Sequence, residues 1–250
     1  EGEQGGGLSS IAGQFGGLAS LAGVNLNSGS SNKSKMAIEI LRSRKFISQF
    51  VVEHNILPAL MAAESWDRDS NKIVYDDDLY DESNSRWVRK HKPYLKPKPS
   101  LQEAYKAFTK IFHVSEDTET SMISISIEHV SPQLAKQWVD WLVLDINKFM
   151  KVKDVSEAQR SIEYLSKQVD ETSFTDIKGV LYKLVEEQVK IIMFANVRDE
   201  YVFKTVDPAL VSEERFKPNR ALISIIGAFI GMSIGLVVVL ARYFSRSSKN

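Results

Sequence analysis

Residues 131–171 read SPQLAKQWVDWLVLDINKFMKVKDVSEAQRSIEYLSKQVDE, and this stretch decides how the rest of the chain can fold. Ser131 can cap a helix, and Pro132 suits the first helical position. Neither proline nor glycine occurs between Leu134 and Val169. We therefore predict one continuous helix of about 40 residues, which would reach about 60 Å and protrude from a compact domain of this size.

The predicted long helix carries a narrow apolar stripe on an otherwise charged surface. Steps of three and four residues separate the members of the stripe, a spacing that places them on one face. They are Trp138, Leu142, Phe149, Val152, Val155, Ala158, Ile162, Leu165 and Val169, interrupted by the polar Asp145. A second amphipathic helix is predicted from about residue 174 to residue 199, and it can pair with part of the first as an antiparallel hairpin. We expect Trp138, Leu142, Phe149 and Val152 to pack in the core of this arm or between subunits.

The segment before the arm is predicted to form a base that contains both helices and a strand. Residues 35–61 show helical spacing that Pro58 ends, and Ser43 can cap a second helix after a bend. Ser100 and Glu103 form a capping box that starts another helix. Residues 62–99 are polar and read as a loop, and the alternation of isoleucine and serine over residues 123–127 predicts a half-buried strand.

After the arm, the chain is predicted to return to the base. Residues 201–209, YVFKTVDPA, read as a strand that can pair in parallel with residues 123–127. Pro208 and Pro218 lie in the part of the chain that leads from this strand to the apolar segment at residues 221–241. The fold class is therefore α+β, with an N-terminal part (1–34), a base (35–130), an arm (131–199) and a return strand with its linker (200–217).

Residues 221–241, ALISIIGAFIGMSIGLVVVLA, contain no charged side chain. A helix of this length spans about 31 Å, close to the thickness of a bilayer core, so we predict a transmembrane helix over residues 218–244. A tail at 245–250 follows it. Gly227, Gly231 and Gly235 recur every four residues, and this small face would let another helix approach closely.

Residues 7–23, GLSSIAGQFGGLASLAG, contain a near repeat of seven residues. They lack the lysine and the preceding strand of a phosphate-binding loop. Their apolar residues fall at helical spacing, which favours two short helical turns packed on the base, with a mobile loop as the alternative.

The composition argues against several classes of chemistry. The 32 basic residues balance the 32 acidic ones, which does not indicate a nucleic-acid-binding surface, and the chain has no cysteine. Four histidines are scattered without metal-ligand spacing, and no nucleotide or nucleophile motif is present. We therefore expect a protein that is not an enzyme, with no catalytic residue, cofactor, metal or nucleic-acid partner.

Three stretches resemble a known family, the Wzz polysaccharide co-polymerases, which determine O-antigen chain length. One is ILRSRKFISQFVVEHNILPAL, with Ser43, Arg44 and Phe46. Another is SMISISIEHVSPQLAKQWVDWLVLDINKFM, with Ser131, Pro132, Ala135 and Trp138. The third covers residues 201–244, with Pro208, Pro218 and the three spaced glycines.

This resemblance implies a bacterial inner-membrane protein with most of the chain in the periplasm and a first transmembrane helix upstream of Glu1. It implies a membrane-proximal α/β base, a long helical arm and a ring of subunits, expected to be an octamer. The implied function is a non-enzymatic scaffold that regulates the length of O-antigen, or a similar lipid-linked glycan, made by a Wzy-type polymerase. The absence of a nucleotide-binding domain after the last predicted helix favours the non-kinase class. The alternative is an exopolysaccharide or capsule co-polymerase that works with a separate tyrosine kinase.

Overall fold

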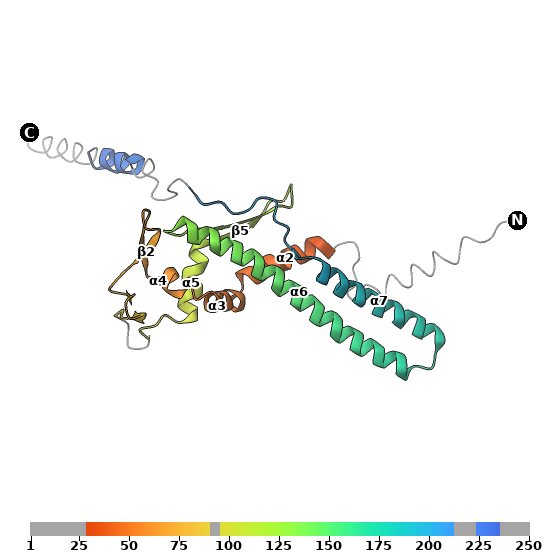
Figure 1. Ribbon diagram of the computed structural model, residues 1–250. Helices are drawn as coiled ribbons and strands as arrows, with labels where there is room; N and C mark the ends of the chain where they lie inside the picture. The colour runs from red at the N-terminus through yellow and green to blue at the C-terminus, as the bar shows by residue number, and fades with distance from the viewer. Residues whose placement is uncertain (1–28, 91–95, 213–223, 236–250) are drawn as a thin grey trace, which may run out of the picture. The chain divides into compact units, whose positions relative to one another are not determined.

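The computed structural model describes residues 29–90, 96–212 and 224–235. The chain divides after Val211 into two units, which are treated separately below. The described part of the first unit is mostly helical, as Figure 1 shows. Its helices are α2 (Gly29–Arg42), α3 (Arg44–Glu53), α4 (Leu57–Ala62), α5 (Leu101–Ile111), α6 (Pro132–Glu171) and α7 (Thr175–Val197).

The described strands form three separate two-stranded antiparallel ladders. They are β1 (Ala63–Asp67) with β2 (Lys72–Tyr75), β3 (Tyr80–Asp81) with β4 (Arg86–Trp87), and β5 (Phe112–Glu116) with β6 (Ile123–Ile127). The expected strand at 123–127 is confirmed as β6, and its partner is β5. The predicted 62–99 loop contains the first two of these ladders.

The segment at residues 35–61 forms three helices, because the backbone turns twice. Ser43 interrupts the first run and caps α3, where its hydroxyl accepts a hydrogen bond from the Phe46 N–H at 3.2 Å. Asn55 then adopts a left-handed conformation, with φ of 49°, between α3 and α4. Asparagine tolerates this conformation better than most residues, and the turn directs α4 away from the axis of α3.

The predicted long helix is confirmed as α6, which spans 40 residues. The Ser131 hydroxyl accepts a hydrogen bond from the Leu134 N–H at 3.3 Å, and Pro132 occupies the first turn. Helix α7 returns along the second half of α6 after a short connection, and the two lie side by side in Figure 1. The expected helical hairpin is therefore present.

The hydrophobic core lies between α2, α3, α5 and the first half of α6. The Phe108 ring of α5 lies 5.5 Å from the Phe50 ring of α3 and 6.4 Å from the Trp138 ring of α6. The largest fully buried side chains are Trp138, Phe50, Phe108, Leu41, Ile47, Leu142, Ile146, Met150 and Val51. Four of the nine come from α6, so its first half belongs to the base and not to the arm.

The return segment after α7 does not form the expected strand over its described residues, up to residue 212. The side chain of Asn147, which is 4% exposed on α6, holds this segment instead. Its amide nitrogen donates to the Phe203 carbonyl at 3.0 Å, and its oxygen accepts from the N–H groups of Val202 (2.7 Å) and Phe203 (2.9 Å). One side-chain amide thus supplies the hydrogen bonds that a neighbouring strand would otherwise provide.

A second contact fixes the same segment to α2 and α6. The Asp154 carboxylate on α6 accepts hydrogen bonds from the Lys33 ammonium at 2.6 Å and from the Tyr201 hydroxyl at 2.7 Å. The Lys33 ammonium also lies 5.3 Å from the centroid of the Tyr201 ring. Burial, followed by the Asp154 carboxylate, raises the pKa of the Tyr201 hydroxyl above its ordinary value, so the hydroxyl stays a donor at neutral pH.

Arg89 holds the loop before α5 against the start of that helix. Its guanidinium donates to both carboxylate oxygens of Glu103, at 2.7 and 3.0 Å, and to the carbonyls of Pro97 (2.6 Å) and Lys96 (3.0 Å). Glu103 also accepts from the Ser100 N–H at 2.9 Å, which completes the predicted capping box. The Arg89 hydrogen bonds, followed by the one from Ser100, lower the pKa of Glu103 to about 2.

The expected transmembrane helix at residues 218–244 is wrong. Among residues 29–90, 96–212 and 224–235, no helix is both long and apolar enough to cross a bilayer. The described part of this segment is helical over residues 224–235. Predictions for residues 7–23, Pro218 and the 245–250 tail lie outside the described residues.

We predict that Asn147→Leu lowers the free energy of unfolding by about 2–4 kcal/mol. Leucine has a similar volume but leaves three buried backbone groups of the return segment without their partners. Chemical denaturation followed by circular dichroism measures the loss. The matched control is Asn196→Leu, at an exposed position of α7, where a change within about 0.5 kcal/mol is expected. Equal losses in the two variants would contradict the role of Asn147.

We also predict that Arg89→Met raises the pKa of Glu103 from about 2 towards its ordinary value of 4.5. Because the folded-state pKa is depressed, this carboxylate stabilises the fold above pH 4.5 and loses that contribution as the pH falls towards 2. Carboxyl carbon NMR across this range reports the titration. The control is Arg86→Met, at an exposed position of β4, which should leave the Glu103 curve unchanged.

Candidate functional site

Helix α7 is apolar on two opposite sides, and only one of them faces α6. The inner side includes Leu184, Ile191 and the fully buried Ala195, which is the one buried residue of this helix. The outer side carries Tyr182, Val189, Met193 and Val197, which are 60%, 39%, 61% and 84% exposed. Their spacing of seven, four and four residues places them on one face. We call these four residues the outer stripe of α7.

The outer stripe is unusual for a surface helix, whose solvent-facing side is normally polar. Phe194, 59% exposed, extends it laterally, and one acidic residue, Glu186, interrupts it. The Glu186 carboxylate pairs with the Lys190 ammonium at 2.9 Å, so the charges bordering the stripe are partly neutralised within α7 itself. In the described chain nothing covers these side chains, which makes the outer stripe the best candidate for an interaction surface.

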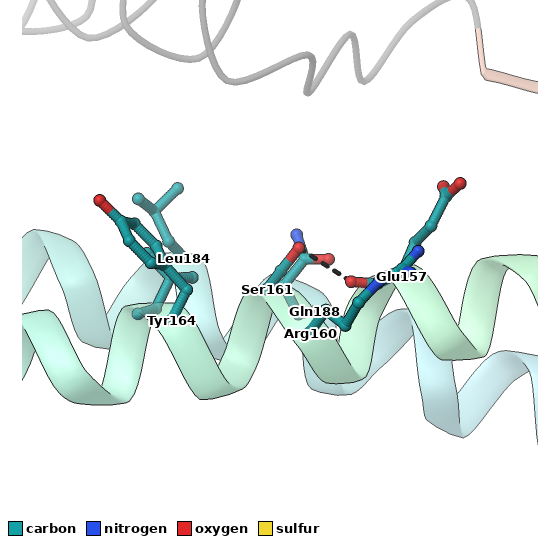
Figure 2. A pocket seen from close by; sticks show the side chains of 7 residues that line it. Glu157, Arg160, Ser161, Tyr164, Leu184 and Gln188 are labelled. Carbon is teal, nitrogen blue, oxygen red and sulfur yellow. Dashed lines mark hydrogen bonds between the residues drawn. The ribbon is translucent and has the colours of Figure 1, made fainter.

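A groove of about 540 Å³ opens between the second half of α6 and α7. Figure 2 shows its lining, with Tyr164 and Leu184 at one end and Glu157 at the other. The Ser161 hydroxyl donates to the Glu157 carbonyl at 2.9 Å, a bond within α6 that leaves the groove itself unfilled. The two helices of the hairpin are therefore not tightly packed along this part of their length.

A second groove, of about 450 Å³, lies between α3 and the middle of α6. Its apolar wall is formed by Phe46 and Phe149, whose rings meet edge to face at 6.0 Å, and by Val152, which is 60% exposed. Its polar wall includes Glu53 and Arg160, and Arg160 lines the first groove as well.

His54 and Asp145 join α3 to α6 at the edge of the second groove. The His54 Nε2 lies 2.7 Å from an Asp145 carboxylate oxygen, and the imidazole stacks on the Trp141 indole at 4.2 Å. Histidine–carboxylate pairs serve in catalysis when a nucleophile adjoins them. The side chain of His54 contacts Asp145, Trp141 and Phe50, so this pair joins two helices. Within the described residues, no three potential metal ligands cluster together.

The structure separates the residues that the sequence grouped as arm packing. Trp138 and Leu142 are buried inside the base, at 1% and 0% exposure, whereas Phe149 is half-buried and Val152 is exposed in the second groove. The true core face continues through Ile146 and Met150 at four-residue spacing. Sequence reasoning missed these two residues, although their spacing from Leu142 could have identified them.

The remaining predicted residues lie near the C-terminal end of the described chain. A Cβ atom added to Gly227, Gly231 or Gly235 would meet no atom within 4 Å, so within the described residues these glycines contact no neighbouring helix. Pro208 is exposed in the return segment. No partner is present, so their expected roles in packing stay predictions.

No protein-family model matches this chain, and the comparison with curated proteins finds no match either.

Proposed function

We propose that this protein is a non-enzymatic, self-assembling scaffold that regulates the chain length of a lipid-linked glycan. Its partners in this proposal are further copies of itself, arranged in a ring of about eight subunits, and a Wzy-type polymerase. Its place of action is the periplasmic side of the bacterial inner membrane. The ring, the polymerase and the location follow from the resemblance alone. The proposal does not depend on a transmembrane helix in this chain.

The observation that carries the proposal is the outer stripe of α7. Helix α7 fully buries one residue and exposes the apolar side chains of the outer stripe to water, an arrangement that costs free energy unless another surface covers them. The half of α6 that extends beyond the base holds α7 along its length, so the stripe is presented away from the core. Such a surface suits assembly better than it suits binding of a small molecule.

A second argument concerns what a scaffold requires of its arm. After Pro132, α6 contains no glycine or proline, so a helix without a break joins the base to the hairpin. Copies that associate through their hairpins would therefore hold their bases at fixed positions. A regular assembly of this kind is what length control by a scaffold needs, because the spacing of the subunits has to be constant.

We predict that the unchanged protein is oligomeric at micromolar concentration and that the double variant Met193→Glu, Val197→Glu is monomeric. Each substitution puts a charge into the outer stripe, where a partner surface would have to desolvate it. Analytical ultracentrifugation measures the mass. The control is Gln159→Glu with Ser166→Glu, which adds the same charge at exposed polar positions of α6, off the outer stripe, and should preserve the assembly. A monomeric unchanged protein would contradict self-assembly.

The scaffold function predicts a specific cellular result. Loss of the gene should replace a ladder with a preferred glycan length by a broad distribution, and the outer-stripe double variant should fail to restore the preferred length. Gel electrophoresis of the extracted polysaccharide measures both. The Gln159→Glu, Ser166→Glu variant should restore the ladder. An unchanged ladder after deletion would refute length regulation even if the protein proves to be oligomeric.

A further inference from the structure

His129 lies between the end of β6 and the start of α6, and both of its ring nitrogens have backbone partners. The Ser131 N–H donates to Nδ1 at 3.1 Å, and Nε2 lies 3.0 Å from the Ala59 carbonyl of α4. The ring is half-buried and lies 4.9 Å from the Trp138 indole, which belongs to the core of the base. One side chain therefore connects α4, the cap of α6 and the core.

These two partners require a neutral imidazole with its proton on Nε2. A backbone N–H can only donate, so Nδ1 has to be unprotonated, and a carbonyl can only accept, so Nε2 has to carry the hydrogen. Protonation of Nδ1 would turn its N–H towards the N–H of Ser131. The hydrogen bond to Ser131 would then be replaced by the repulsion of two donors.

The hydrogen bond from the Ser131 N–H to His129 Nδ1 supports the first turn of α6, the longest described helix. Ser131 is the N-cap of α6 and is 2% exposed. Its hydroxyl accepts from the Leu134 N–H, and its carbonyl accepts from the Ala135 N–H at 3.0 Å. Displacement of the Ser131 backbone would disturb both bonds, because they depend on the position of this one residue.

The charged groups around His129 offer no compensation for a positive charge on its ring. The elements β6 and α4 contain no charged residue. The first charged residues of α6, Lys136 and Asp140, pair with each other at 2.6 Å, and the neighbouring Glu128 carboxylate lies 3.2 Å from His113. Burial lowers the pKa of His129 below its ordinary value of 6.5, although the hydrogen bond to the Ala59 carbonyl acts in the opposite direction.

We propose that His129 is an acid-sensitive latch, which fastens the N-terminal turn of α6 to α4 when neutral and releases it when protonated. Acid therefore loosens the cap of α6.

The direction of the effect on stability follows from the lowered pKa. Above pH 6.5 the folded and unfolded forms both hold His129 neutral, and its contribution to stability is complete. As the pH falls below 6.5, the unfolded form binds the proton first, so the free energy of unfolding decreases until the folded form is protonated too. The latch thus acts on the acid side of neutrality.

Two measurements on the full chain test the latch. Nitrogen-15 NMR of the imidazole should show the Nε2–H tautomer at pH 7.5 and a titration below pH 6.5. Hydrogen exchange, corrected for the intrinsic effect of pH, should show the Leu134 and Ala135 amides losing protection by about tenfold per pH unit once the site titrates, whereas the Met150 amide keeps its protection.

The variant His129→Gln separates the latch from a general effect of acid. Glutamine can donate to Ala59 and accept from Ser131 but does not titrate, so the pH dependence of the Leu134 and Ala135 amides should disappear. The control is the unchanged protein, measured under the same conditions, which should retain it. Loss of protection that persists in His129→Gln would overturn the proposal. If that variant fails to fold, a wild-type His129 that shows the other tautomer or titrates at 6.5 or above would overturn it.

Discussion

The described fold depends on the burial of one side of the first half of α6. Trp138, Leu142, Ile146 and Met150 recur every four residues and are all fully buried against α3 and α5. Complete burial of each such side chain contributes about 1.5–3 kcal/mol, so this row stabilises the base more than any single polar contact does. The hairpin, the return segment and the cap at Ser131 are all positioned by the helix that carries this row.

Local signals in the sequence were sufficient for the elements that local chemistry determines. The uninterrupted run after Pro132 predicted α6, the pair Ser100 and Glu103 predicted the start of α5, and the serine–isoleucine alternation predicted β6. Each signal needs only neighbouring residues to produce its structure. The return segment was not predictable in this way, because Asn147 replaces a strand partner from more than 50 positions away. A lone asparagine in an apolar helix gives no indication of that role.

The candidate site was predicted only in part, for a geometric reason. The prediction of one apolar stripe at steps of three and four residues assumes that a single surface packs against α6 along its whole length. Helix α6 has three partners in turn: the base core, the return segment and α7. The side of α6 that is buried therefore changes along its length, and Phe149 and Val152 line a groove while Ile146 and Met150 enter the core.

For α7, the amphipathic pattern predicted one apolar face. The structure shows that α6 covers this face and that a second apolar face lies opposite it.

The distribution of polar contacts explains how one helix can serve both a core and an exposed surface. Asn147 and Asp154 fix the return segment to α6 just where the helix leaves the base. Beyond this point α6 buries only Ala158 and Val169, and the groove beside Tyr164 shows that α7 does not fill the space next to it. The hairpin therefore buries few side chains completely, although α6 and α7 lie against each other along its length, and it leaves the outer stripe exposed. In the proposed assembly, a neighbouring subunit that covered the outer stripe would stabilise the hairpin and so link the stability of the arm to self-association.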